Sequence, residues 1–350
     1  MRTLVVRLDS AGDVLLAGPA IRAAAAASEH TAVLCGPQGA WAARMLPGVD
    51  EVLVHDAPWE GLEPPPVRTE DVRALLADLA QRRFDRALVL ASHHQSPLPA
   101  ALLLRLAGVR WIAADSEHYP GSLLDLRHRR APGRHEAEAA LDLAAAAGLP
   151  LPPGDDGRLR ITPPPDTSGL TGTAPYLVLH PGAAVPARTW SPGRAATALR
   201  SLTRAGHRVV VTGGPGEEAL TAQVAAAGPA LDLGGRTAPD QLAGILAHAD
   251  AAVVGNTGPA HLAAAVGTPV VSLFAPVVPA ERWAPYRVPH VLLGRPDAPC
   301  AGSRARSCPV PGHPCLDSVT DAELLTAVAT LTGGPIGPTG PAPTRREVTA

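Results

Sequence analysis

The sequence predicts an α/β protein made of two Rossmann-like domains, each with a parallel sheet covered by helices. Short apolar runs alternate with helical patterns through both halves of the 350-residue chain. A segment dense in Pro, Gly, Asp and Thr separates the halves, and the length exceeds one ordinary core. We therefore expect one domain over residues 1–165 and another over 166–332. The polar, Pro- and Gly-rich residues 333–350 are expected to form a disordered tail.

The first half alternates strand and helix signals from its first residues. The expected strands are the apolar runs 3–8, 31–36, 49–56, 86–92 and 108–114. The expected helices are 14–27, 70–83 and 134–150, the last of which is stopped by Gly148 and Pro150. Strands that alternate with helices favour a parallel sheet.

The second half repeats this pattern. Its expected strands are 176–182, 208–214, 230–235, 251–256 and 269–275. Its expected helices are 192–205, 217–228, 238–250, 258–267 and 320–331, with Thr320 as the N-cap of the last. The linker is expected between Pro150 and Pro175.

Composition limits the class of protein. Hydrophobic residues make up 46% of the chain and charged residues 18%, and no apolar run approaches the roughly 20 residues of a membrane helix. Arg7 and Asp9 interrupt the N-terminal apolar segment, which therefore makes a poor signal peptide. We expect a cytoplasmic protein and leave open a peripheral contact with the inner face of a membrane. The net charge of −2 gives no argument for nucleic acid as a partner.

All 30 basic residues are Arg, because the sequence contains no lysine. This usage, with the many Ala and Pro residues, indicates a GC-rich genome. An anion held by a side-chain cation must therefore be bound by Arg or His, and Arg binds phosphate with two parallel hydrogen bonds.

Five polar segments follow expected strands, at the sheet edge where open α/β proteins bind ligands. They are 10–13, 180–192, 212–218, 255–261 and 275–285. In 255–261, "GNTGPAH", a Gly-rich turn opens a helix, an arrangement suited to phosphate. Many α/β turns contain Gly and Thr only to reverse the chain, so this turn alone is not specific. It also lacks the spacing of a P-loop.

The four cysteines leave two readings open. Cys300, Cys308 and Cys315 lie close in sequence with His313 among them, so they could hold zinc as three sulfurs and one nitrogen. Their spacing lacks the C-x2-C pair of strong zinc motifs, which favours a loop with unligated thiols. We predict no metal site.

Taken together, three motifs resemble glycosyltransferase family 9, the heptosyltransferases. They are "RLDSAGDVLLAGPAIRA", "LHPGAAVPARTW" and "GNTGPAHLAAAVGTPVVSLFA", and the resemblance extends over roughly residues 2–330. It implies a GT-B architecture, in which two Rossmann-like domains face each other across a cleft. It further implies an inverting, metal-independent transfer of heptose from ADP-heptose, with the acceptor mainly on the N-terminal domain.

The resemblance implies roles for particular residues. Asp13 matches the proposed general base, and Arg188 matches a cation that offsets charge on the departing diphosphate. The alternatives are an acid placed at a helix N-terminus for Asp13 and a surface arginine for Arg188. Donor-binding residues are expected among Gly182, Gly213, Glu217, Asn256, Thr257, Gly258 and His261. Family members with lipopolysaccharide acceptors commonly have Asp where this chain has Asn256, so the chain departs from the family pattern at a position expected to contact the donor sugar or the turn.

Residues of the N-terminal domain are expected to bind the acceptor. Arg127, Arg130 and Arg134 lie in a basic segment that either binds an anionic acceptor or forms a solvated loop. His93 follows a strand and is expected to face the acceptor, and Gly12 allows the acceptor to approach the backbone beside Asp13.

We predict transfer to a hydroxyl of a carbohydrate or glycoconjugate. If the GC-rich composition reflects an actinobacterium, the acceptor is a natural product or a cell-envelope glycan other than lipopolysaccharide. The alternatives are a GT-B enzyme with a GDP- or UDP-sugar, a non-catalytic nucleotide-sugar-binding protein, and an epimerase of related architecture.

Overall fold

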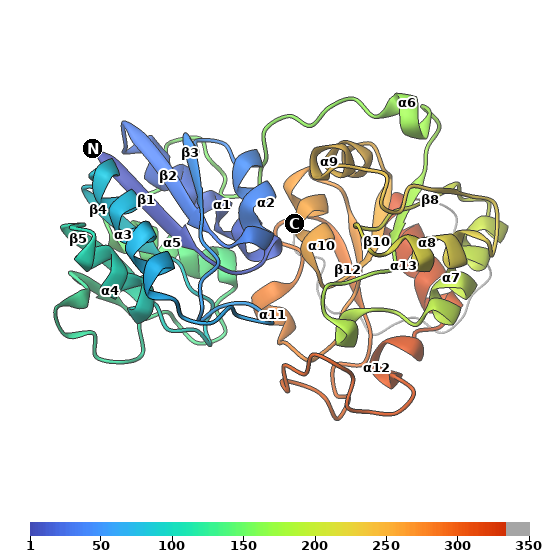
Figure 1. The fold of residues 1–350 in the computed structure, drawn as a ribbon. Coiled ribbons are helices and arrows are strands. Elements are labelled where there is room, and N and C mark those ends of the chain that lie inside the picture. Colours follow the sequence, from blue (N-terminus) through green and yellow to red (C-terminus); the bar gives the residue numbers. More distant parts are fainter. Residues whose placement is uncertain (334–350) are drawn as a thin grey trace. The chain divides into compact units, whose positions relative to one another are not determined.

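The computed structural model describes residues 1–333, which form two compact units (Figure 1). The first unit is Met1–Thr162, and the second begins at Pro163. The tail predicted for 333–350 lies, except for Gly333, outside the described residues. No helix within residues 1–333 combines the length and apolar character needed to span a bilayer.

The first unit is a parallel six-stranded sheet with helices on both faces. Its strands are β1 (Arg2–Arg7), β2 (His30–Cys35), β3 (Glu51–Val54), β4 (Arg86–Val89), β5 (Trp111–Asp115) and β6 (Leu126–His128). Its helices are α1 (Ala11–Ala26), α2 (Ala40–Met45), α3 (Thr69–Arg82), α4 (Leu98–Leu106) and α5 (Glu136–Ala146). The strand order is β3-β2-β1-β4-β5-β6, which is the order of the dinucleotide-binding Rossmann fold.

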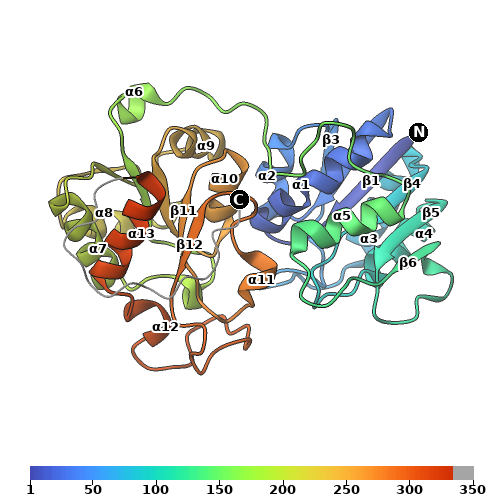
Figure 2. The same cartoon turned by 180° about the vertical axis from the view of Figure 1, so that it is seen from behind.

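Helix α1 is apolar almost all round because it packs on two sides. Its small residues, a run of Ala and Gly, let it contact the sheet and α5 together, and 13 of its 16 residues are buried. Helices α3 and α4 lie over the opposite face of the sheet (Figures 1 and 2). The sheet is thus covered on both faces, and its open edge for ligands is the one where the strands end.

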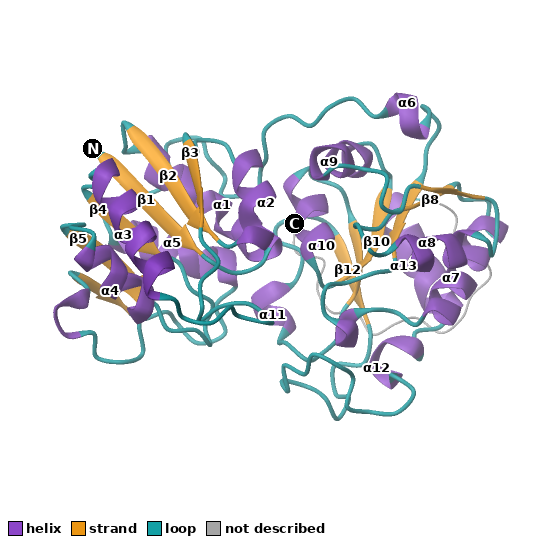
Figure 3. Ribbon diagram, in the orientation of Figure 1, coloured by secondary structure: helices purple, strands orange, loops and turns teal. Residues whose placement is uncertain are grey.

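The second unit repeats this topology, with strands and helices alternating again (Figure 3). Its strands are β7 (Leu177–His180), β8 (Val209–Val211), β9 (Ala230–Asp232), β10 (Ala251–Gly255), β11 (Val270–Leu273) and β12 (His290–Leu293). Its helices are α6 (Ser168–Thr171), α7 (Pro192–Arg204), α8 (Glu218–Ala225), α9 (Pro239–Ala247), α10 (Gly258–Ala265), α11 (Ala280–Trp283), α12 (Pro314–Asp317) and α13 (Asp321–Thr332). The parallel order β12-β11-β10-β7-β8-β9 is the order of the first sheet.

One local signal in the second unit acts as the sequence predicts, and one buried side chain adds a contact that was not predicted. Thr320 caps α13, where its hydroxyl accepts from the Glu323 backbone N–H and Glu323 in turn accepts from the Thr320 N–H. Trp190 is the largest buried side chain, and its indole N–H donates to the Leu316 carbonyl at 3.0 Å. The indole thereby ties the segment after β7 to α12.

The predicted α/β class with two Rossmann-like domains and parallel sheets is confirmed. Helices α2 and α4 and strands β6 and β12 were not predicted, and neither were the short helices α6, α11 and α12. Helix α4 begins beside Pro97 and Pro99 in a short apolar run without clear periodicity. Strands β6 and β12 are short edge strands that bury little, so their sequences carry no alternation that identifies them.

The first part of the expected linker belongs to the first unit. Arg22 of α1 donates to both carboxylate oxygens of Asp155, at 2.7 and 2.9 Å, and to the Arg158 carbonyl. The Thr162 N–H donates to the Met45 carbonyl at 2.7 Å. This double contact with Arg22 fixes the segment against α1, although its composition is typical of a linker.

Asp155→Asn is expected to destabilise the protein by about 2 kcal/mol at pH 7. Hydrogen bonds from Arg22 are the main cause that lowers the pKa of Asp155 to about 2, and its side chain is only 8% exposed. Because the folded-state pKa is depressed, this stabilisation is present above about pH 4 and is lost as the pH falls towards 2. Urea unfolding at pH 7 and pH 3 measures the difference. Asp156→Asn, at the half-exposed neighbouring position, is the control, and an equal effect of both variants would contradict this role of Asp155.

Candidate active site

Asp13 lies in the first turn of α1, directly beyond the end of β1. Ser10 is the N-cap residue, and its hydroxyl donates to Asp13 Oδ2 at 2.8 Å. A carboxylate in this position is favoured by the helix dipole. Its side chain is 17% exposed, so Asp13 also remains reachable by a ligand. The geometry is therefore compatible both with a helix-terminal acid and with a base.

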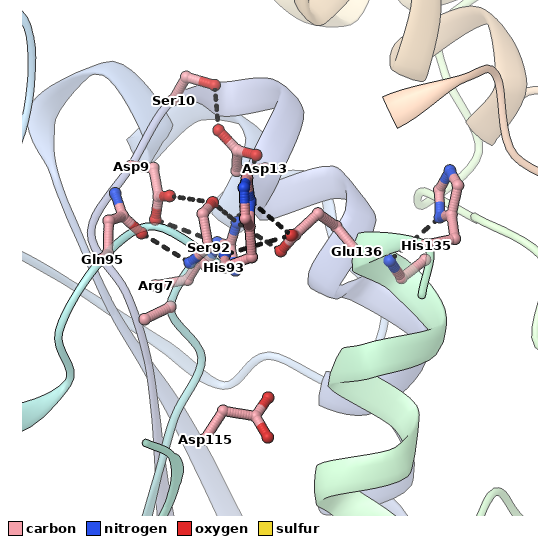
Figure 4. Close-up of polar contacts among 12 residues, drawn as sticks. Arg7, Asp9, Ser10, Asp13, Ser92, His93, Gln95, Asp115, His135 and Glu136 are labelled. Carbon is pink, nitrogen blue, oxygen red and sulfur yellow. Dashed lines mark hydrogen bonds and ion pairs between the residues drawn. The ribbon is translucent and has the colours of Figure 1, made fainter. Parts of the chain in front are cut away.

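Arg7, the last residue of β1, is the centre of the polar network beside Asp13 (Figure 4). Its guanidinium lies 3.1 Å from Asp9 Oδ1, 3.2 Å from Asp13 Oδ1 and 3.8 Å from Glu136 Oε2. It also donates to the Ser92 hydroxyl at 2.8 Å. Because the Arg7 side chain is only 3% exposed, these groups replace the water that would otherwise surround its charge.

Burial and charge act in opposite directions on this network. Burial alone would lower the pKa of Arg7, but the charges of Asp9, Asp13 and Glu136 outweigh it and raise that pKa. Burial is the main cause that raises the pKa of Asp9 to about 6, and Asp13 adds to it against the attraction of Arg7. One guanidinium thus only partly compensates the carboxylates around it.

Residues that follow β4 extend the network from Asp9 to Glu60. The Ser92 hydroxyl donates to Asp9 Oδ2 at 2.8 Å, and the Ser92 N–H donates to Gln95 Oε1 at 2.6 Å. The Gln95 amide in turn donates to Glu60, which follows β3. Burial first, and then the charges of Asp9 and Asp13, raise the pKa of Glu60 to about 7.

Glu136 forms the opposite side of the network, at the start of α5. Its carboxylate accepts from Arg130 Nη1 at 2.9 Å and from the His93 N–H at 3.3 Å. Arg130 also donates to Asp115 at 3.0 Å and to the Ala91 carbonyl at 2.6 Å. Strand ends β1, β4 and β5 are thereby joined to α5 through side chains.

The predicted basic segment makes contacts within its own unit. Arg127 donates to the carbonyls of Ser116 and Glu117, and Arg134 pairs with Glu138 and Asp142. Arg130 is paired with Glu136 and Asp115, so carboxylates offset the charge of Arg130 and Arg134, while Arg127 is held by backbone carbonyls.

In the second unit, three residues predicted to bind the donor lie together beyond β7 and β8. The Glu217 carboxylate accepts from the Gly214 N–H at 2.7 Å and lies 3.7 Å from His180 Nε2. A Cβ on Gly182 would come within 1.9 Å of Glu217 Oε1, and one on Gly213 within 2.6 Å of the Thr221 side chain. Glycine at position 182 therefore leaves room for the Glu217 carboxylate, and glycine at position 213 leaves room for the side chains of Thr221 and Glu217. Burial lowers the pKa of His180, which favours its neutral form beside this acid.

The turn predicted to bind diphosphate lies beyond β10 and opens α10. Thr257 is the N-cap residue of α10 with extended backbone, and within residues 1–333 its buried hydroxyl has no hydrogen-bond partner. Gly258 begins the helix, and His261, one turn further on, is 5% exposed. A Cβ on Gly255 would come within 2.8 Å of the Arg188 carbonyl, so glycine there lets the Arg188 segment approach the turn. The second unit thus brings the backbone of Arg188 beside Gly255.

Asn256 holds this turn to the end of β11. Its Oδ1 accepts from the Ala275 N–H at 3.2 Å, and its Nδ2 donates to the Ala275 carbonyl at 3.3 Å. The residue is 4% exposed. The oxygen and the nitrogen of the Asn256 amide both bond to the Ala275 backbone, so Asn256 holds the turn against the segment after β11.

The cysteines are all free thiols. Cys300 and Cys315 are buried, and burial together with the neighbouring Cys300 raises the pKa of the Cys315 thiol to about 12. His313 is engaged with the Ala187 carbonyl at 3.2 Å. Across residues 1–333, no group of three or more His, Cys, Asp or Glu side chains is arranged to hold a metal ion.

Sequence reasoning missed most of the network around Asp13. Arg7 and Asp9 carry a signal, because two charges interrupt the apolar run of β1, and a buried charge at a strand end needs partners of opposite charge. Ser92, Glu60 and Glu136 come from distant segments, and only the strand order of the sheet brings them together.

Known proteins match the chain over most of its length. The family model "Glycosyltransferase family 9 (heptosyltransferase)" matches residues 72–313. Lipopolysaccharide heptosyltransferase 1 of Pseudomonas aeruginosa is 31% identical over 332 residues, which cover 88% of this chain and 87% of that protein. Lipopolysaccharide heptosyltransferase 3 of Escherichia coli is 32% identical over 104 residues, 28% of this chain and 31% of that protein.

Solved structures share the fold at low identity. The E. coli ADP-heptose lps heptosyltransferase II superposes with a TM-score of 0.71 at 21% identity, covering 95% of this chain and 98% of that one. A family 9 glycosyltransferase from Veillonella parvula gives 0.74 at 18% identity, covering 95% and 97%. The E. coli heptosyltransferase WaaC with ADP gives 0.66 at 19% identity, covering 94% and 97%.

Asn256→Asp tests the support of the diphosphate turn. A carboxylate cannot donate to the Ala275 carbonyl, so we expect a loss of about 1–3 kcal/mol of stability at pH 7. Burial and the facing carbonyl raise the pKa of an acid at this position, so the loss should shrink below about pH 4 and grow as the pH rises. Thermal unfolding between pH 4 and 8 measures it. Gln223→Glu makes the same change at an exposed site of α8, and a loss as large there would contradict the account.

Proposed function

The chain belongs to glycosyltransferase family 9 and is a glycosyltransferase, and from this membership we propose that it transfers a heptose from ADP-heptose. The acceptor we propose is a hydroxyl of a carbohydrate or glycoconjugate, in a natural product or a cell-envelope glycan. The observation that carries the proposal is the reachable Asp13 carboxylate beyond β1, held by Arg7 and Ser10.

Asp13 is proposed as the general base. The acceptor oxygen becomes a stronger nucleophile as its proton passes to the Asp13 carboxylate, and it then attacks the anomeric carbon. The bond from that carbon to the diphosphate oxygen breaks with its electron pair, and ADP leaves. Direct attack opposite the leaving group inverts the anomeric configuration. Arg7 supports this role, because a buried cation 3.2 Å from Oδ1 stabilises the ionised carboxylate and fixes its orientation.

The donor is proposed to bind the second unit. The N-terminus of α10 offers backbone N–H groups and a favourable dipole to the diphosphate, with Thr257, Gly258 and His261 at the turn and Asn256 supporting it. Arg188 would offset the charge that develops on the departing diphosphate without a metal ion. Glu217, in the space made by Gly182 and Gly213, is suited to accept hydrogen bonds from the ribose hydroxyls.

The acceptor is proposed to bind the first unit, around Gly12 and His93. Gly12 lies in the first turn of α1 beside Asp13, and the His93 backbone is fixed by Glu136. Arg130, Arg127 and Arg134 would shape this side by holding Glu136 and the segment before α5 in place. We propose that the protein is located in the cytoplasm, and the proposal includes a peripheral contact with the inner face of the membrane.

Nucleotide binding tests the donor. We expect ADP to raise the melting temperature more than GDP or UDP does at equal concentration, because ligands that bind only the folded state stabilise it by mass action. A larger shift with GDP or UDP would replace the proposed donor with the corresponding nucleotide sugar.

Asp13→Asn tests the base. We expect transfer from ADP-heptose to fall by at least about 10³-fold, because an amide cannot accept the proton. Stabilisation by ADP should be unchanged, because the variant lies in the other unit. Ser10→Ala, which removes only the hydroxyl that touches Asp13, is the comparison and should retain most activity. Transfer by Asp13→Asn at the wild-type rate would remove Asp13 from this role.

A further inference from the structure

His180, the last residue of β7, is a buried titratable side chain that the proposed mechanism does not use. The residue is only 5% exposed. Its Nδ1 lies 3.0 Å from the hydroxyl of Thr212, which follows β8, and its Nε2 lies 3.7 Å from Glu217 Oε2. The imidazole therefore stands between a buried hydroxyl and the carboxylate proposed to bind the ribose.

These two neighbours decide which ring nitrogen of His180 carries the proton. Burial lowers the pKa of His180, so the ring is neutral at pH 7 and has a single N–H. A carboxylate oxygen only accepts hydrogen bonds, so a ring nitrogen without a proton would repel Glu217 Oε2. The proton is therefore favoured on Nε2, and Nδ1 accepts from the hydroxyl of the fully buried Thr212.

The Glu217 carboxylate has one oxygen in use and one oxygen available. Oε2 accepts from the Gly214 N–H at 2.7 Å and faces His180. Oε1 accepts no hydrogen bond from residues 1–333. A Cβ at position 182 would lie 1.9 Å from Oε1, so this oxygen is directed at the backbone of Gly182. Because the Glu217 side chain is 24% exposed, its carboxylate is open to a ligand hydroxyl.

His180 limits the rotation of this carboxylate. The terminal torsion of a glutamate is broad, so the single bond from Gly214 leaves the carboxylate free to turn. At 3.7 Å the His180 contact is longer than a hydrogen bond, and it acts through the attraction between the Nε2–H dipole and the charge of Oε2. The ring also fills the space beside Oε2. Both effects keep Oε2 on the His180 side and Oε1 on the side of Gly182.

We propose that His180 is a positioning residue for nucleoside recognition, which orients Glu217 so that Oε1 accepts a hydrogen bond from a ribose hydroxyl. Thr212 acts behind it and holds the ring in the tautomer that directs an N–H at Glu217. The consequence is a preference for ribonucleotides over deoxyribonucleotides. This inference rests on the proposed function, since it deepens the proposed contact between Glu217 and the donor.

Isothermal titration calorimetry of the full chain with ADP, 2′-deoxy-ADP and 3′-deoxy-ADP tests the preference. We expect the wild type to bind ADP about tenfold more tightly than at least one deoxy analogue, because the missing hydroxyl leaves Oε1 without a donor. Equal binding of all three nucleotides would overturn the inference and leave the proposed donor intact. Binding of none of them would refute the proposed donor, and this inference with it.

Two substitutions of His180 separate the roles of its ring nitrogens. His180→Gln places an amide nitrogen near the position of Nε2 and should keep the preference for ADP, whereas His180→Asn reaches only the position of Nδ1 and should lose it. His207→Asn is the control, since His207 precedes β8 at the end of the strand opposite Thr212, and it should bind like the wild type. A preference that persists in His180→Asn, or that is lost equally in both His180 variants, would overturn the inference.

Nitrogen-15 NMR of the histidine rings tests the tautomer in the wild type, without a substitution that could unfold the protein. We expect the His180 ring to be neutral at pH 7 with its proton on Nε2. Thr212→Val, which removes the hydroxyl, should reduce this tautomeric bias and weaken the preference for ADP. A proton on Nδ1 of the neutral ring, or a charged ring at pH 7, would overturn the inference.

Discussion

The ion pairs of Arg7 are the constraint on which the first unit depends. A guanidinium buried at the end of a central strand is tolerated only if carboxylates and hydroxyls replace its water. The chain supplies them from α1, from the end of β4 and from α5, and it thereby fixes Asp13 relative to three separate elements. The same arrangement brings the carboxylates of Asp9, Asp13 and Glu136 together around one guanidinium.

The second unit uses the same strand order for a different chemistry. There the strand ends carry glycines, and each removes a side chain where another group must approach. Gly182 makes room for Glu217, and Gly255 makes room for the Arg188 segment. The first sheet thus presents carboxylates at its strand ends, and the second presents the backbone N–H groups at the start of α10, a division that fits the proposed acceptor hydroxyl and the proposed diphosphate.

Much of the fold was predictable, because buried parallel strands and the caps of α7 and α13 leave strong local signals. The short edge strands β6 and β12 were not, since they bury too little to impose a pattern. Motifs at strand ends located Asp13 and the turn of Thr257. The residues around Asp13 were not predicted, because only the order of the strands brings Glu60, Ser92 and Glu136 near Arg7. In the predicted basic segment, Arg130 and Arg134 form ion pairs with Glu136 and Asp142 of the same unit.

The central claim is that the carboxyl groups around Arg7 form one electrostatic unit with Asp13. Carbon-13 NMR titration of the Asp and Glu carboxyls, in the wild type and in Asp13→Asn, measures it most directly. The account predicts titration of Asp9 near pH 6 and of Glu60 near pH 7 in the wild type, with both shifted to lower pH in the variant, because Asp13 no longer adds its charge. Titration of both groups near their ordinary values of about 4, unchanged by the variant, would contradict it.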